Sequence, residues 1–323
     1  MTTTTTGQPT TTFRQLGDSG LTVSTVGLGC NNFGMRVDAA GTQAVVDACL
    51  DAGVTLFDTA DVYGGTPGLS EELLGRALGD RRADVVVATK FGADMRGANG
   101  PDWGVRGSRR YVRKAVEASL RRLGTDWVDL YQLHTPDPVT PIEETLAALH
   151  ELVVEGKVRY LGSSNFTGWQ VVDADWVART AGSTPMVSAQ NEYSLLNRGA
   201  EAELVPACEH AGVGLLPYFP LASGLLTGKY SRSAQAPEGS RLASRPERLA
   251  AADFDRIERL QRFADERGLS LLDVAVGGLA AQPAVASVIA GATSAEQVRA
   301  NVAAGGWQPT PDDLVALDEV APA

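Results

Sequence analysis

The chain has 323 residues, 44% of them hydrophobic and 21% charged, which is the composition of a globular protein with a large core. A net charge of −11 argues against a nucleic acid or an anionic membrane as partner, because both are polyanions that bind basic surfaces. No apolar run approaches the ~20 residues that a bilayer requires, and the N-terminus lacks the features of a secretion signal, so we expect a cytoplasmic protein.

The first segment, residues 1–12, is rich in threonine and has almost nothing to bury. We expect it to be a disordered tail before a single domain over residues 13–323. Residues 13–16 and 21–25 flank the turn sequence Gly17-Asp18-Ser19-Gly20, which predicts a β-hairpin. This hairpin is expected to cap one end of the main body.

After the hairpin, short apolar runs alternate with helical patterns. The expected strands cover residues 26–29, 55–57, 85–89, 127–133, 158–162, 186–190, 213–217 and 286–290. The expected helices lie near residues 40–52, 70–78, 108–123, 142–155, 168–180, 201–211, 272–281 and 294–304. This alternation predicts one α/β domain, a (β/α)8 TIM barrel. A doubly wound sheet is the alternative, but residues 27–32 and 224–230 do not meet the glycine-rich nucleotide motifs.

Two long irregular segments, residues 225–252 and 92–107, each follow an expected strand. Loops beyond ~15 residues in compact domains are usually functional lids or disordered linkers. We expect both segments to lie over the C-terminal face of the barrel, the first as a cover for the site. Trp103 lies near the centre of the second.

Three consecutive strands lead into ionisable residues. Asp58 and then Tyr63 follow the second strand, Lys90 follows the third, and His134 follows the fourth. Because catalytic residues of parallel barrels lie at the C-terminal ends of strands, we expect these four side chains to meet. Each alone is more often a cap, a surface pair or a satisfied core residue, but together at successive strand ends they predict a proton-donating site.

Within this group Tyr63 is the expected acid. A free tyrosine has a pKa of ~10, and a neighbouring Lys90 ammonium would lower it. A buried Lys90 needs a carboxylate partner, which Asp58 supplies. His134 could hydrogen bond to the same substrate oxygen.

The chain resembles the aldo-keto reductase family from Phe13 to about Ala304. The resemblance rests on Asp58 followed by Tyr63-Gly64, on Lys90 in Ala-Thr-Lys-Phe-Gly, and on His134 in Leu-Tyr-Gln-Leu-His-Thr-Pro-Asp. It implies that Tyr63 is the acid, that Lys90 and Asp58 tune it, and that His134 orients the substrate. It also implies hydride transfer from NADPH to an aldehyde or ketone.

The resemblance extends to cofactor motifs. Gly162-Ser163-Ser164-Asn165-Phe166 is similar to the family's Gly-Val-Ser-Asn-Phe, so Ser164 and Asn165, with Gln190, are expected to hydrogen bond the nicotinamide carboxamide. Tyr218 matches the aromatic residue that stacks on the nicotinamide ring. Further contacts are expected from Phe219, Pro220, Leu221 and Lys229, and from Ser223 and Gly224, whose small size would let backbone N–H groups approach the pyrophosphate.

Residues 291–301 resemble the segment that binds adenosine, with Ser294 as helix N-cap. The contacts expected here are Gly291, Thr293, Gln297 and Asn301. Thr293 stands where many members carry Lys or Arg for the 2′-phosphate of NADPH. We therefore expect NADPH to be preferred and NADH to be usable, with Arg299 or Lys229 partly compensating.

The expected substrate is a small carbonyl compound, and its class, like the oligomeric state and the physiological direction, stays open. The expected substrate-binding residues are Asn31, Tyr63, Trp103 and His134. Asn31 stands where some family members have a pocket tryptophan, which favours a more polar or roomier pocket. No metal site is expected, because the three cysteines and three histidines lack metal-ligand spacing.

Two other functions are compatible with parts of the sequence. A barrel glycosidase could use Asp58 and Glu192 as its carboxylate pair, but the nicotinamide-type segments have no role in that chemistry. The same fold could also serve as a cofactor-binding regulatory subunit with slow turnover. The complete Asp, Tyr, Lys and His set favours an active enzyme.

Overall fold

The computed structural model describes residues 11–232 and 234–323. Positions 1–10, most of the expected N-terminal tail, lie outside the described residues. Thr12 is described, and its hydroxyl hydrogen bonds to that of Thr25 (2.8 Å), so contacts with the domain begin before the hairpin.

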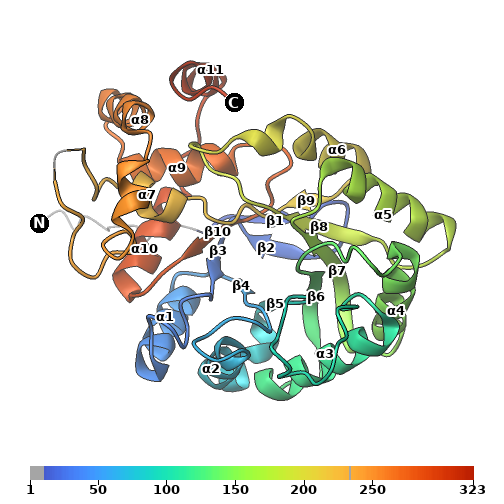
Figure 1. Ribbon diagram of the computed structural model, residues 1–323. Helices are drawn as coiled ribbons and strands as arrows, with labels where there is room; N and C mark the ends of the chain where they lie inside the picture. The colour runs from blue at the N-terminus through green and yellow to red at the C-terminus, as the bar shows by residue number, and fades with distance from the viewer. Residues whose placement is uncertain (1–10, 233) are drawn as a thin grey trace, which may run out of the picture.

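Eight parallel strands form one curled sheet at the centre of the molecule (Figure 1). They are β3 (Val26–Gly29), β4 (Leu56–Asp58), β5 (Val86–Phe91), β6 (Val128–Leu133), β7 (Val158–Ser164), β8 (Met186–Gln190), β9 (Gly214–Leu215) and β10 (Val288–Gly291). Their order is β10-β3-β4-β5-β6-β7-β8-β9. Hydrogen bonds from Ala286 N to Leu215 O and from Ile289 N to Pro217 O, both 3.0 Å, join β9 to the last segment. The expected (β/α)8 barrel is confirmed.

Helices surround the sheet on its outer face (Figure 1). They are α1 (Ala39–Asp51), α2 (Leu69–Leu78), α3 (Arg109–Leu123), α4 (Ile142–Val154), α5 (Gly168–Thr180), α6 (Leu204–Ala211), α9 (Leu271–Ala280) and α10 (Ala295–Ala304). Side chains of Ser108 and Ser294 accept N–H bonds in the first turns of α3 and α10, which fixes where these helices begin. The helices pack on outward-facing strand residues such as Val87 and Tyr131.

The expected hairpin is present as β1 (Phe13–Gln15) and β2 (Thr22–Ser24), paired antiparallel. Leu16 and Val23 are fully buried in a second apolar cluster with barrel-interior residues such as Leu130. Ser24 N donates to the Thr55 hydroxyl (3.0 Å), just before β4 begins. The hairpin therefore closes the end of the barrel where the strands begin, opposite the candidate site.

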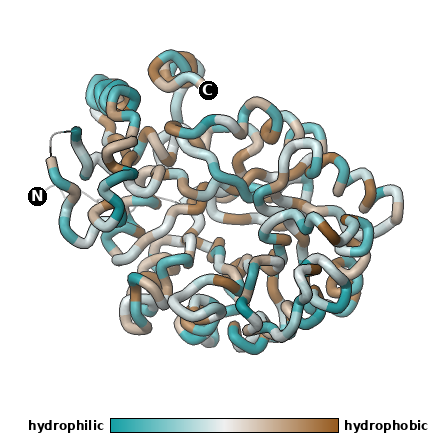
Figure 2. The backbone as a smooth tube through the Cα atoms, viewed as in Figure 1, coloured by the Kyte–Doolittle hydropathy of each residue, from teal (hydrophilic) through white to brown (hydrophobic). Residues whose placement is uncertain are grey.

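Two helices outside the eightfold pattern were not expected: α8 (Phe254–Glu266) and α11 (Pro311–Val320). They lie beside the barrel (Figure 1), joined by the Arg267–Asp313 ion pair (2.8 Å). Figure 2 shows α8 as largely hydrophilic, which fits its position on the outside. Segment 225–252 contains a short helix, α7 (Pro246–Ala250). The 3-10 turns are η1 (Gly79–Asp84), η2 (Gly199–Glu201) and η3 (Ala222–Thr227).

Candidate active site

The four expected proton-transfer residues come from three neighbouring strands. Asp58 is the last residue of β4, Lys90 lies near the end of β5, and His134 directly follows β6. Tyr63 lies on the loop after β4, where its N–H donates to Ala60 O (3.1 Å). Because β4, β5 and β6 are adjacent and parallel, their C-terminal ends bring these side chains together.

Lys90 and Asp58 form a buried ion pair, with Nζ 2.6 Å from Oδ2. The ammonium also donates to Thr59 O (3.0 Å). Burial lowers the pKa of Lys90, but the negative charge of Asp58 and the neighbouring Tyr63 outweigh burial and raise it above its ordinary value. Lys90 is therefore a cation at neutral pH, held in the interior by its carboxylate partner.

Tyr63 lies next to this cation, with Lys90 Nζ 5.1 Å from the centre of its ring. Burial raises the pKa of Tyr63, and the positive charge of Lys90 offsets burial only in part, so the net shift is upward. Lys90 lowers the pKa of Tyr63 as expected, but desolvation of the phenolate is the larger effect, so the pKa does not fall below its ordinary value. Tyr63 is a protonated phenol at neutral pH.

His134 is a neutral imidazole. Burial, with a smaller contribution from the Lys90 charge, lowers its pKa to about 3. Its ring meets that of Tyr63 edge-on, with centroids 5.7 Å apart and planes at 83°. Nδ1 is buried without a hydrogen-bond partner among the described residues. A neutral His134 can donate one hydrogen bond but does not compete with Tyr63 as an acid.

Two glutamines bind the second oxygen of Asp58. Gln132 Nε2 donates to Asp58 Oδ1 (3.1 Å), and Gln190 Nε2 donates to the same atom (2.8 Å). Gln190 was expected at the nicotinamide, whereas Gln132 was not singled out. Gln132 lies two residues before His134, and alternate residues of a strand face the same side. This spacing was the signal in the sequence that could have identified Gln132.

A cavity of about 720 Å³ lies at this end of the barrel, and Asp58, Tyr63, His134 and Asn31 line it. Lys90 is fully buried beneath it. The wall also includes every expected cofactor contact, namely Ser164, Asn165, Gln190, Tyr218, Phe219, Pro220, Leu221, Ser223, Gly224, Lys229, Gly291, Thr293, Gln297 and Asn301. Glu192 is not part of the wall, so the carboxylate pair that a glycosidase requires does not form with it.

Trp103 does not reach the cavity. Its side chain is 70% exposed, and the Arg110 guanidinium stacks on its ring with Cζ 4.0 Å from the centroid. This contact with α3 keeps the indole on the outside of segment 92–107. Asn31 does line the cavity. Its Oδ1 lies close to Gly291, 3.7 Å from the position that a Cβ atom on Gly291 would occupy, so Asn31 is next to the segment expected to bind adenosine.

The residues expected at the nicotinamide are already linked to one another. Asn165 has a left-handed backbone (φ 61°), and its Nδ2 donates to His134 O (2.9 Å) and to Ser164 Oγ (3.1 Å). Tyr218 Oη donates to Asn165 Oδ1 (2.8 Å). These bonds fix the Tyr218 ring at the cavity wall.

Two cations on the wall were missed from the sequence, Arg36 and Arg241. Arg36 donates to Gly239 O and Arg241 to Asn32 Oδ1 (3.2 Å), which ties segment 225–252 to the loop after β3. Burial, helped by the charge of Arg36, lowers the pKa of Arg241.

The charge on this wall is positive. With Lys229, the two arginines make three lining cations. Within the described chain, the lining carboxylates are Asp58, already paired with Lys90, and Glu296. This side of the cavity therefore suits an anionic ligand.

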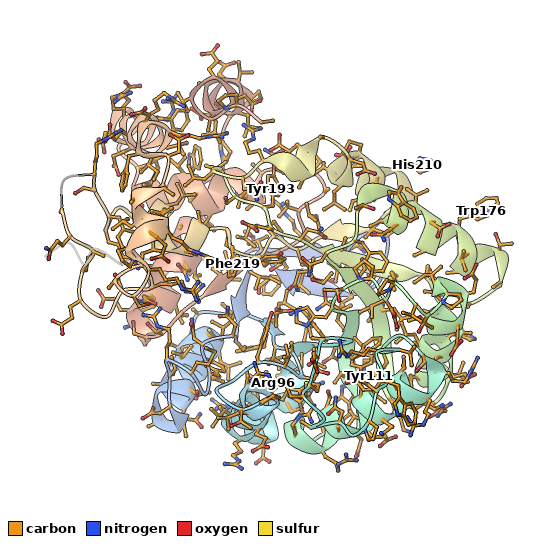
Figure 3. All side chains as sticks on the ribbon, viewed as in Figure 1. Arg96, Tyr111, Trp176, Tyr193, His210 and Phe219 are labelled. Atoms are coloured by element: carbon orange, nitrogen blue, oxygen red, sulfur yellow. The ribbon has the colours of Figure 1, made fainter. Side chains whose placement is uncertain are left out.

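Figure 3 shows Phe219 on the inner side near β10, whereas Trp176 and His210 project at the periphery.

Thr293 faces its own helix. Its N–H and hydroxyl both donate to Gln297 Oε1 (2.9 and 3.2 Å), while Ser294 caps α10. Arg299, considered a compensating cation, is exposed and lies outside the cavity wall.

Among the described residues, no helix is long and apolar enough to cross a membrane, and no three potential metal ligands cluster.

The sequence profile of the Aldo/keto reductase family matches residues 25–322. The chain belongs to this family. The expected resemblance is thereby confirmed, and membership supports oxidoreductase activity on a carbonyl substrate.

Three relatives illustrate the range of similar proteins. A probable voltage-gated potassium channel subunit beta of Oryza sativa subsp. japonica is 38% identical over 306 residues, 90% of each chain. The uncharacterized oxidoreductase YrpG of Bacillus subtilis (strain 168) is 37% identical over 321 residues, 96% of each chain. The L-glyceraldehyde 3-phosphate reductase of Escherichia coli (strain K12) is 36% identical over 307 residues, 90% of this chain and 87% of that one.

Proposed function

We propose that this aldo/keto reductase reduces an aldehyde or ketone with NADPH, and that Tyr63 donates the proton. The observation that carries the proposal is a protonated Tyr63 beside the buried Lys90–Asp58 ion pair, on the wall of a cavity with the expected cofactor contacts. A bound nicotinamide would supply the hydride. The protein must hold the carbonyl, supply the proton and keep both partners in place.

The donor and acceptor groups at the cavity wall fit a primary amide. The Ser164 hydroxyl accepts from Asn165 and has no acceptor of its own among the described residues, so it can donate to an amide carbonyl. Gln190 uses its NH₂ group on Asp58, so its Oε1 is the end left to accept from an amide NH₂. The Tyr218 ring would lie against one face of the nicotinamide, and Lys229, Arg36 and Arg241 would face phosphates.

Proton transfer follows from the charges around Tyr63. The neutral His134 donates a hydrogen bond to the carbonyl oxygen and places it beside the phenol. As negative charge develops on that oxygen, Tyr63 Oη gives up its proton, and the Lys90 ammonium stabilises the phenolate that remains. Asp58 keeps Lys90 charged throughout.

A panel of aldehydes, ketoses and aryl ketones, assayed by NADPH oxidation, tests the proposal. We expect turnover with at least one class of small carbonyl and tight binding of NADPH.

A cofactor-binding regulatory subunit remains the second candidate, and the identity with relatives named as potassium channel beta subunits favours keeping it. Tight NADPH binding without turnover on any member of the panel would support it against an active reductase.

A further inference from the structure

The floor of the cavity holds a small network of four buried side chains. Asp58 Oδ2 binds Lys90, while Asp58 Oδ1 accepts from both Gln132 and Gln190. Gln132 is fully buried and Gln190 is 1% exposed, so water does not replace these bonds. Gln132 comes from β6 and Gln190 from β8, with β7 between them.

The orientation of both amides follows from Asp58. A carboxylate accepts hydrogen bonds and cannot donate them, so each glutamine must turn its NH₂ group toward it. The second N–H of Gln190 points at Gln132 Oε1 (3.4 Å). Gln190 thus has two anchors for its NH₂ group, and its own Oε1 is directed away from Asp58, where Gln190 lines the cavity.

We infer that Gln132 is a positioning residue that locks the Gln190 amide, so that Gln190 Oε1 accepts from the NH₂ of the nicotinamide carboxamide. This inference rests on the proposed function. Asp58 then joins two tasks through its two oxygens, because Oδ2 holds Lys90 for proton transfer and Oδ1 orients the cofactor contact. Without Gln132, the NH₂ group of Gln190 keeps its bond to Asp58 but loses the second anchor, so the plane of the amide can turn about the remaining bond and Oε1 is no longer held in one direction.

Cofactor analogues separate this role from a merely structural one. The 3-acetylpyridine analogue of NADP⁺ carries a methyl group in place of the carboxamide NH₂, so it cannot donate to Gln190. Because the analogue loses one neutral hydrogen bond, we expect the wild-type protein to bind NADP⁺ roughly five- to tenfold more tightly than the analogue. Isothermal titration calorimetry measures both dissociation constants without requiring turnover.

In Gln132→Met, which keeps the volume and removes the amide, we expect this preference to fall to within about twofold of unity. The matched control is Ser188→Ala on β8, two residues before Gln190, whose buried hydroxyl has no partner in the described part of the chain. It should keep the wild-type preference.

Gln132→Glu provides a second variant with the shape of glutamine. When the introduced carboxyl group is protonated, it donates to Asp58 and accepts from Gln190, whereas its ionised form repels Asp58. The ionisable groups around position 132 are Asp58, which it contacts, and Lys90 on the other oxygen of Asp58, with Tyr63 and neutral His134 next to them. The preference should therefore persist at low pH and disappear as pH rises.

The outcomes separate the two proposals. A wild-type protein that binds neither cofactor form overturns the proposed function itself. A wild-type protein that prefers NADP⁺, with Gln132→Met showing the same preference, leaves the function standing and overturns the role of Gln132. Equal affinity of the wild-type protein for NADP⁺ and the analogue also overturns that role.

Discussion

The proton on Tyr63 is subject to two opposing effects. Burial disfavours the phenolate and raises the pKa, and the Lys90 ammonium favours it and lowers the pKa, with burial the stronger. In the pH profile of the reduction rate, the fall at basic pH should therefore lie above the ordinary tyrosine pKa of 10.0. His134, with a pKa of about 3, adds no limb near neutral pH.

Replacing Lys90 tests this balance. Lys90→Met removes the charge that lowers the Tyr63 pKa, so the basic limb should move to still higher pH, and kcat should fall roughly 10²-fold because a weaker acid is left. The pH profile of kcat under single-turnover conditions measures both. Thermal melting reports separately the loss of stability from leaving Asp58 buried without its cation, about 3–5 kcal/mol. An unmoved limb would show that Lys90 and Tyr63 are not coupled.

Cofactor selectivity is also a residue-scale property. Thr293 binds Gln297 and carries no charge, so we expect modest preference for NADPH over NADH. Thr293→Arg should raise the NADPH/NADH ratio of kcat/KM by roughly 10- to 150-fold, the range of a charge-assisted contact to phosphate. Steady-state kinetics with both cofactors check this. A wild-type ratio already in the many thousands, unchanged by the substitution, would mean that other residues hold the 2′-phosphate.

The sequence predicted the positions of those site residues that lie at the ends of strands. Asp58, Lys90 and His134 could be placed together because parallel strands end on one face. Gln132 was harder to find, since a glutamine inside a strand has no motif and gains its role only through Asp58. The prediction that Trp103 binds substrate failed because the length of a loop does not say whether a side chain on it points inward. Arg110 holds the indole on the outside.

At the scale of elements, the barrel was predictable because each strand and helix repeats one pattern. Helices α8 and α11 were missed because they add to the outside rather than continue the repeat. The signal for α8 was present, with Phe254, Ile257 and Leu260 at helical spacing. Segment 225–252 is irregular, but it is anchored to the main core, because Leu226, Tyr230 and Leu242 are buried there.

This packing changes the expected behaviour of the segment. Leu242 N donates to Tyr230 Oη (3.1 Å), so these anchors should resist hydrogen exchange without cofactor. Residues 237–241, held by Arg36 and Arg241, should gain protection when NADPH binds their cations. Hydrogen exchange read by mass spectrometry measures both parts. Equal protection of 237–241 with and without saturating NADPH would contradict a covering role.

At the scale of the whole molecule, a second buried charge cluster links the Tyr63 loop to two helices. Glu71 is buried on α2 and binds Arg122 of α3 (2.6 Å) and the Thr89 hydroxyl (2.6 Å). Asp61 is also fully buried, but its contact is a long bond from Asn99 Nδ2 (3.3 Å). Arg122 thus pairs directly with Glu71 and is linked to Asp61 through Asn99, whose Oδ1 accepts from Arg122 (3.1 Å).

Burial and the negative charge of Glu71 raise the pKa of Asp61 well above its ordinary value, and Arg122 offsets this only in part. The nearby phenols, Tyr111 and Tyr131, have raised pKa values and stay neutral. A group whose pKa is higher in the folded state contributes stability that is present at acid pH and is lost as pH rises through the folded value. As pH rises above the pKa that Asp61 has in the unfolded state, Asp61 therefore lowers the stability of the folded protein increasingly.

Asp61→Asn, which mimics the neutral acid, should melt like the wild-type protein at acid pH and at increasingly higher temperature than wild type as pH rises. Glu71→Gln is the matched control. It removes the partner of Arg122 and should destabilise at neutral pH by about 3–5 kcal/mol. Thermal melting across pH measures both variants. Parallel melting curves for Asp61→Asn and wild type at every pH would show that Asp61 is not held neutral.

The central claim is that Tyr63 gives its proton to the substrate oxygen. Single-turnover reduction by Tyr63→Phe, with NADPH affinity titrated in parallel, tests it most directly. Loss of the acid should lower the rate by ~10²–10⁴-fold while the NADPH dissociation constant stays within about twofold of wild type. Near-normal reduction by Tyr63→Phe, with the cofactor bound as tightly as before, would contradict the account.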